Sequence, residues 1–302
     1  MKTNGAGTAG PRLRPLSPVC YRPCLVPAVA GAVPVSASPQ ARTFGTRLRW
    51  WRMRRGLSQL DLAGEAGISQ RHLSFLESGR TRPSHEMVLR LGAALDLPLR
   101  KQNGLLLAAG FAPYWQERPL DARELAQVNR TLDFILAQQE PFPAFVVDRR
   151  WNLMRANGGA ARLTRFLLGD APPEANGGAV NLADALVSPD SLRPFIVNWQ
   201  EVALQFLRSV QADAAADATD ETAALLRRLL SYPGIPLLAE AQWLEEPAGP
   251  VLNIHFRRAE ESLRLFTTIT TLGTPQDVTV QEIRIECFFP SDEATERFFR
   301  GS

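Results

Sequence analysis

The residues with the clearest chemistry lie in one short segment, 69–77. Leu73 and Leu76 are three residues apart, which predicts the inward face of a short helix. An arginine on the other face could donate two hydrogen bonds to guanine O6 and N7, and a glutamine could pair in the same way with adenine N6 and N7. A helix of this kind could read bases in the major groove of DNA, and its outward residues are Gln70, Arg71, Ser74 and Phe75.

Neighbouring residues are candidates for supporting roles. Phe75 could touch a thymine methyl or pack against another helix, and His72 could reach a phosphate or be a plain surface residue. Ser69 is expected to cap the helix at its N-terminus, and we count it among the DNA-binding residues. The arginines that could contact phosphates, or simply form a solvated surface, are Arg47, Arg49, Arg54, Arg55, Arg80 and Arg82.

Five short helices are expected to position this segment. Apolar spacing and preceding serines place them over residues 42–55, 59–65, 70–77, 85–95 and 98–109. Gly67 marks a tight turn between the second helix and the third. One member of the pair Trp50 and Trp51 should lie in the core. Two of these five helices are joined by a glycine turn, which is typical of a helix-turn-helix domain.

The same residues resemble a known family. The string GLSQLDLAGEAGISQRHLSFLESGRTRPS, residues 56–84, is similar to the XRE-type, lambda-repressor-like DNA-binding domain. The resemblance covers residues 42 to about 100. It implies that Gln59 bonds both a phosphate and a residue of the recognition helix, and that Arg52 pairs with Glu77 to hold the first helix to the third. Domains of this type also serve as protein-contact modules, as in antitoxins, and that alternative stays open.

Charge and composition divide the chain. Residues 42–115 hold 12 basic and 5 acidic residues, whereas residues 116–302 hold 18 basic and 26 acidic ones. A basic block suits a polyanionic partner. The first 40 residues contain seven prolines, which oppose regular structure. We therefore predict a disordered extension over 1–41, the helix-turn-helix domain over 42–112 and a second domain over 115–302.

The second domain mixes helices with strands. Helices are predicted over 125–138, 158–168, 191–210 and 222–230, and two strands over 144–148 and 151–155 form a hairpin. Three further strands, over 251–257, 263–272 and 278–289, should be antiparallel neighbours, with Ile283, Ile285 and Cys287 on one face of the last. The predicted fold class is therefore multi-domain, an all-α five-helix domain followed by an α+β, PAS-like domain with an antiparallel sheet.

This order of elements is that of a PAS-type sensor domain. The segments PFPAFVVDRRWNLMRANGGAARL and RPFIVNWQEVA are similar to the MmyB-like ligand-binding domain, which is typically fused behind an XRE-type helix-turn-helix. The resemblance implies a pocket for a small apolar or fatty-acid-like molecule. Seven residues could line such a pocket, although apolar residues in this pattern more often form an ordinary packed core: Phe145, Trp151, Trp199, Phe206, Phe256, Phe266 and Ile283.

The sequence gives little support to catalytic, metal-binding or membrane-spanning classes. It contains no Gly-rich phosphate loop, no G-x-S-x-G and no H-E-x-x-H motif. Its three histidines and three cysteines form no ligand pattern. No run approaches the about 18 apolar residues of a spanning helix. We expect a cytoplasmic protein that is not an enzyme and needs no metal or cofactor, with a catalytic C-terminal domain as an alternative.

Together these patterns predict a sequence-specific DNA-binding transcription regulator. The expected partners are a double-stranded DNA operator, a small ligand in the second domain, and a second copy of the chain. The homodimer is expected because two-fold operators are usually bound by dimers. The alternatives are an antitoxin-like protein-interaction module and an enzyme in the C-terminal domain.

Overall fold

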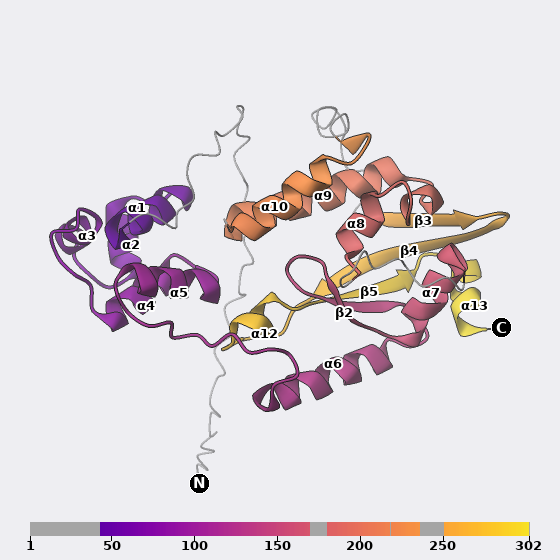
Figure 1. Cartoon of the computed structure of the whole chain (residues 1–302), viewed down its shortest axis with the longest axis horizontal. Helices are drawn as coiled ribbons and strands as arrows, with labels where there is room; N and C mark the ends of the chain where they lie inside the picture. The colour runs from indigo at the N-terminus through magenta and orange to yellow at the C-terminus, as the bar shows by residue number, and fades with distance from the viewer. Residues whose placement is uncertain (1–42, 170–179, 218, 236–250, 302) are drawn as a thin grey trace, which may run out of the picture. The chain divides into compact units, whose positions relative to one another are not determined.

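A computed structural model describes residues 43–169, 180–217, 219–235 and 251–301. Five helices come first, and an α+β region with a five-stranded antiparallel sheet follows (Figure 1). This is the fold class predicted from the sequence. The extension predicted over residues 1–41 lies outside the described residues.

The five helices share one core. They are α1 (Phe44–Arg54), α2 (Gln59–Glu65), α3 (Gln70–Glu77), α4 (His85–Ala94) and α5 (Leu99–Ala108). Leucines from each helix meet in the interior with no exposed surface or almost none, for example Leu48, Leu73 and Leu106. Trp51 is buried in this core and Trp50 is half-buried against it, so the prediction that one of the two lies inside is confirmed.

Gly45 allows α1 to approach the end of α3. A Cβ atom at this position would lie only 2.5 Å from the carbonyl oxygens of Leu76 and Glu77. No real side chain tolerates such a contact with backbone, so any other residue would push the two helices apart. The absence of a side chain at Gly45 therefore sets the distance between α1 and α3.

The sheet has the strand order β2-β1-β5-β4-β3, with antiparallel neighbours throughout. Its strands are β1 (Ala144–Val147), β2 (Leu153–Ala156), β3 (Asn253–Arg258), β4 (Glu261–Thr270) and β5 (Arg284–Pro290). In the central strand β5, Cys287 pairs with Ala144 of β1 and with Thr268 of β4. The predicted three-strand meander and hairpin are confirmed, and β5 joins them.

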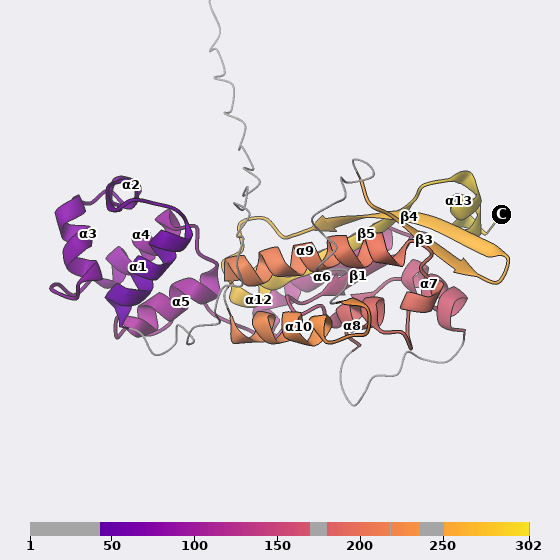
Figure 2. The same cartoon turned by 90° about the horizontal axis from the view of Figure 1, so that it is seen from above.

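Helices cover both faces of the sheet (Figures 1 and 2). α6 (Ala126–Gln138), which follows a short 3-10 helix (Arg123–Leu125), lies on one face, where Leu132 packs with Val146 and Ile285. The other face carries α7 (Gly158–Leu168), α8 (Leu182–Val187), α9 (Trp199–Asp217) and α10 (Asp220–Leu230). α13 (Glu293–Arg300) packs against β4 and β5.

Two predicted element boundaries were wrong. Residues 278–282, expected to begin the last strand, form the short helix α12 (Val278–Glu282), because the Asp277 side chain caps it by accepting from the Thr279 N–H. The helix expected over 191–210 begins only at Trp199, after a 3-10 helix (Arg193–Phe195). Between them Ile196 forms an isolated β-bridge with Phe256, which keeps this stretch extended.

α12 also contacts α5. The Gln281 side chain accepts from the Leu99 N–H at 2.7 Å, and the Glu282 carboxylate accepts from Arg100 Nε at 2.8 Å. Arg100 pairs with the carboxylate of Glu117 as well. β5 begins two residues after Glu282, so the central strand of the sheet directly follows the residue that is ion-paired with α5.

Candidate functional site

α3 presents two different faces. Leu73 and Leu76 are fully buried against the other helices, whereas Gln70 and Arg71 are exposed and Ser74 is half-buried. The exposed side chains carry hydrogen-bond donors, and the Arg71 guanidinium carries a positive charge. This face can therefore donate hydrogen bonds to a partner that α3 approaches side-on.

Phe75 brings together Arg71 of α3 and Arg80, which follows the end of the helix. Its half-buried ring lies 5.4 Å from Arg71 Cζ and 5.6 Å from Arg80 Cζ. Contacts of this kind contribute about 0.5–1 kcal/mol each at exposed sites. The aromatic ring thus orders two exposed cations. This role differs from the two considered from the sequence, which were contact with a thymine methyl and packing against another helix.

The turn before α3 is fixed by its backbone and by an arginine of α4. Gly67 has a φ of 65°, a conformation that glycine adopts without strain. Arg90 donates to the carbonyl oxygens of Ala66 and Gly67 at 2.5 and 3.1 Å. At the start of α3 the Ser69 side chain accepts from the N–H of the half-buried His72. Ser69 is thus the predicted N-cap, whereas Arg90 was not singled out from the sequence.

A buried ion pair joins α1 to α3. Arg52 Nε and Nη2 donate to the two carboxylate oxygens of Glu77 at 2.6 and 3.0 Å. Gln59 Nε2 donates to the same carboxylate at 2.8 Å, and Arg52 Nη1 donates to the Leu57 carbonyl. The hydrogen bonds that Arg52 donates to Glu77 raise the pKa of Arg52. The arrangement brings together three residues that the resemblance associated: the Arg52–Glu77 pair and Gln59 beside α3.

The other arginines divide into two groups. Arg47 donates to the Gly104 carbonyl at 3.1 Å, and Arg55 donates to the Leu95 carbonyl at 3.0 Å. Arg54 lies over the Trp50 ring. Arg54 also donates to the Ala215 carbonyl at 2.8 Å, so all three arginines hold separate segments of the protein together. The remaining exposed candidates for phosphate contact are Arg49, Arg80 and Arg82.

The second candidate site is a cavity in the α+β region, lined by one face of the sheet and by α7, α8 and α9. Its volume is about 330 Å³, at the lower end of the roughly 300–1,000 Å³ typical of small-molecule sites. Its walls are mostly apolar side chains. Four of the residues expected in a pocket line it, namely Phe145, Trp151, Phe206 and Phe256.

The other three residues expected in the pocket lie elsewhere. Side chains alternate between the faces of a strand, so Phe266 projects away from the cavity and stacks on Phe289, with ring centroids 5.5 Å apart. Ile283 packs on the α6 face of the sheet. The Trp199 ring lies 3.6 Å from Arg193 Cζ instead of lining the cavity. For these three residues the expectation is corrected.

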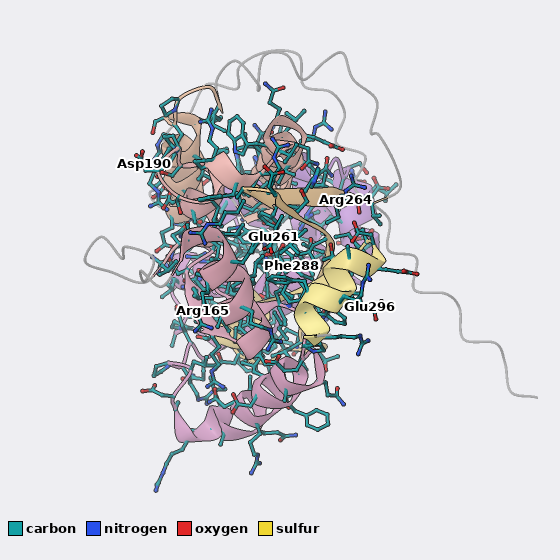
Figure 3. All side chains as sticks on the ribbon, turned by 90° about the vertical axis from the view of Figure 1, so that its right-hand side faces the viewer. Arg165, Asp190, Glu261, Arg264, Phe288 and Glu296 are labelled. Atoms are coloured by element: carbon teal, nitrogen blue, oxygen red, sulfur yellow. The ribbon has the colours of Figure 1, made fainter. Side chains whose placement is uncertain are left out.

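Glu286 brings a carboxyl group into the cavity. β5 is packed on both faces, so Ile285 and Cys287 face α6, whereas Glu286 and Phe288 face the cavity. Figure 3 shows Phe288 between α7 and α13, which are marked by Arg165 and Glu296. Burial raises the pKa of Glu286 to about 7, although a hydrogen bond from Thr267 acts in the opposite direction. The carboxyl therefore keeps its proton to a higher pH than an exposed glutamate does.

Sequence reasoning missed Glu286 for a definite reason. Ile283, Ile285 and Cys287 were correctly placed on one face of the sheet, and that alternation puts Glu286 on the opposite face, for which no role was predicted. A sheet covered by helices on both sides has no solvent face near its centre. The sequence does contain one indication. Several helices with an apolar face follow residue 157, and they must pack on the second face of the sheet, to which Glu286 belongs.

We predict that Glu77→Ala lowers the free energy of unfolding by about 3–5 kcal/mol, because it leaves the buried Arg52 guanidinium without its carboxylate. Equilibrium urea denaturation measures this change. Glu65→Ala is the control, since Glu65 is an exposed acid on α2, and we expect it to change stability by less than about 0.5 kcal/mol. Equal losses for both variants would contradict the role given to the pair.

We also predict a pH-dependent effect of Glu286. Its pKa is about 7 in the folded protein against an ordinary 4.5, so the folded state binds the proton more tightly than the unfolded state. Stability from this group is therefore complete below pH 4.5 and is lost as pH rises towards 7, by up to roughly 3 kcal/mol. The Glu286→Gln side chain does not titrate, so the free energy of unfolding of the variant should rise relative to that of the wild type between pH 5 and pH 8. An identical stability difference at both pH values in urea denaturation would show that Glu286 does not titrate in this way.

The described residues offer neither a metal-binding cluster nor a membrane-spanning helix. Within residues 43–169, 180–217, 219–235 and 251–301, no group of three or more His, Cys, Asp or Glu side chains could hold a metal ion. Over the same ranges, no helix combines the length and the apolar character needed to cross a membrane.

Comparisons with known proteins agree with this division into two sites. Residues 43–102 match the model of a helix-turn-helix domain, and residues 128–301 match the model of the MmyB-like transcription regulator ligand binding domain. No curated protein matches the chain. The second match covers more than half of the 302 residues. The chain therefore belongs to the family of the MmyB-like transcription regulator ligand binding domain, and with its helix-turn-helix domain it is a DNA-binding transcription regulator that carries a ligand-binding domain.

Proposed function

We propose that residues 42–112 bind a double-stranded DNA operator with α3 in the major groove and thereby read its sequence. The observation that carries the proposal is the two-faced α3, with Gln70 and Arg71 exposed above buried leucines. In this orientation Arg71 would bond guanine O6 and N7, and Gln70 would bond adenine N6 and N7. The support for α3 also favours this reading, because the Arg52–Glu77 pair fixes the helix before any partner binds.

Supporting contacts follow from the same docking. Ser74 and His72 would lie at the edge of the groove, and Ser69 at the N-terminus of α3 would face a phosphate. Gln59 would place its amide at the phosphate backbone while it stays bonded to Glu77. The exposed arginines, with Arg80 held by Phe75, would supply the salt-dependent part of the affinity.

We predict that Arg71→Ala weakens binding to the preferred duplex by about 1–3 kcal/mol and relaxes selectivity at one base position. The duplex is first selected from a randomised pool with the wild-type protein, and affinities are then measured by fluorescence anisotropy. Arg123→Ala, which removes an exposed arginine outside the five helices, is the control and should leave the affinity unchanged. If Arg71→Ala leaves the affinity for the selected duplex intact, α3 does not read bases through Arg71.

We further propose that residues 115–302 form a domain that senses a small apolar or fatty-acid-like molecule in the cavity. Aromatic and aliphatic walls favour an apolar ligand, because each buried methylene contributes about 0.8 kcal/mol of transfer free energy. Phe145, Trp151, Phe206 and Phe256 supply much of that wall. A ligand there can change DNA binding only by binding one arrangement of the protein better than another.

The central strand offers a route from the cavity to the DNA-binding domain. β5 carries Glu286 and Phe288 in the cavity wall, and α12 directly precedes it. Glu282 of α12 is ion-paired with Arg100 of α5. We propose that a ligand that moves β5 alters this contact, and through it the presentation of the helix-turn-helix domain.

The apolar cavity leads to a prediction about chain length. For 1-octanol, 1-decanol and 1-dodecanol, each two-carbon step should raise the affinity by about 1.6 kcal/mol, or roughly 15-fold, until the cavity is full. Isothermal titration calorimetry of the whole protein measures the series. Ala185 lines the cavity from α8, so Ala185→Trp should fill it and remove the dependence. Affinities that do not vary with chain length would argue against an apolar ligand site.

We also propose that the working species is a homodimer in the cytoplasm. A dimer would present two copies of α3 to two half-sites about one helical turn of DNA apart. A DNA-binding regulator acts where its operator lies, which favours the cytoplasm.

A further inference from the structure

The chemical character of the cavity differs from that of a simple apolar pocket. Of the described residues that line it, Glu286 is the single one with an ionisable side chain. It lies in the middle of the central strand, opposite Phe145 of β1 and Ile269 of β4. A carboxyl group in such a place loses its hydration and needs polar partners. Its surroundings therefore indicate what kind of ligand head would fit beside it.

Polar side chains of two elements lie near Glu286. Thr267 of β4 donates a hydrogen bond to the carboxyl. On the helical side, Arg284 of β5 pairs with Asp213 of α9, which fixes how α9 lies over β5. Ser209 is one helical turn from Asp213, and Glu286 is two residues along the strand from Arg284. Each step is roughly 5–7 Å from the Arg284–Asp213 pair, so we place Ser209 and Glu286 at about the same depth in the cavity. Ser209 lines the cavity too, so one region of the wall is polar.

A negatively charged head would meet no cation among the described residues of the cavity wall. Among the described residues that line the cavity none is basic. The nearest cation on the same face of β5, Arg284, is occupied by the carboxylate of Asp213. A ligand carboxylate would therefore be desolvated beside Glu286, and two carboxyl groups in contact repel each other unless they share a proton. A hydrogen-bond donor would instead find an acceptor, because a carboxyl accepts more than the one bond that Thr267 supplies.

We propose that the cavity selects an amphiphile whose polar head donates hydrogen bonds to Glu286 and carries no negative charge, as a long-chain amine or alcohol does. The inference rests on the proposed ligand-binding function and narrows it, since it excludes the ionised fatty acid from the fatty-acid-like class. The apolar walls hold the chain, and Glu286 with Thr267 and Ser209 selects the head. An ammonium head would form a charge-assisted bond with the carboxylate, which is stronger than the neutral bond of an alcohol.

The test compares three probes with the same chain: dodecylamine, 1-dodecanol and sodium dodecanoate, each below its micelle concentration, at pH 7. Binding to the whole protein is measured by titration calorimetry. We expect the amine and the alcohol to bind roughly 10-fold to 100-fold more tightly than dodecanoate. The ratio of the amine to the alcohol tells a cationic head from a neutral donor.

Two variants make the test specific. Glu286→Gln keeps the shape of the side chain and removes its charge. It should therefore reduce the ratio of the amine and alcohol affinities to the dodecanoate affinity by at least about tenfold. Glu261→Gln makes the same change at an exposed position of β4 (Figure 3) and should leave all three affinities unchanged. Thermal unfolding of each variant establishes that it is folded.

The outcomes separate the two proposals. Dodecanoate binding as tightly as the alcohol, or an unchanged preference in Glu286→Gln, overturns the head-group inference while the apolar ligand site stands. If none of the three probes binds, the ligand-binding proposal and this inference both fail. The expected order of affinities, abolished in Glu286→Gln alone, establishes Glu286 as the residue that selects the head.

Discussion

The packing of β5 on both of its faces is the constraint on which the ligand-binding domain depends. The strand pairs with β1 on one side and β4 on the other, so it has no open edge. Its alternate side chains must enter two different interiors. Ile285 and Cys287 fill the interior under α6, and Phe288 fills the other. A carboxyl at Glu286 is costly in such a strand, and residues that break a packing rule are commonly found where function requires them.

The two domains treat a carboxyl group inside the protein in opposite ways. Glu77 is matched on both oxygens by Arg52 and also receives a hydrogen bond from Gln59, so its charge is compensated within the fold. Glu286 receives a hydrogen bond from the Thr267 hydroxyl, and its pKa rises to about 7. The first arrangement serves rigidity, because it locks α3 against α1 before DNA is met. The second leaves hydrogen-bonding capacity that a ligand can use.

Most of the helix-turn-helix domain could be predicted from the sequence because its signals are local. Serine caps, Gly67 and the leucine spacing of α3 are each legible within a few residues. Contacts between distant residues were harder to foresee. Arg90 holds the turn from α4, and Phe75 orders two arginines, one of them only after the helix has ended. Neither contact leaves a periodic trace in the sequence.

In the second domain the strands could be predicted but not which residues face the cavity. Phe266 and Ile283 are as apolar as Phe256, and only the strand register and the layer of helices decide which of the three faces the cavity. The helix α12 was also missed, because Val278 and Val280 favour a strand by propensity while the cap at Asp277 acts over a few atoms. Glu286 became visible only once both faces of the sheet were known to be covered.

We expect occupancy of the cavity to change how tightly the protein binds DNA, and one titration tests this coupling directly. A duplex selected from a randomised pool is titrated with the whole protein, with and without saturating 1-dodecanol, and with Ala185→Trp as the variant whose cavity is closed to ligand. We expect the alcohol to shift the DNA affinity of the wild-type protein at least fivefold in one direction, of the order of allosteric coupling energies, and to leave the variant unaffected. An affinity that the alcohol does not change, although it binds, would show that the cavity does not regulate DNA binding.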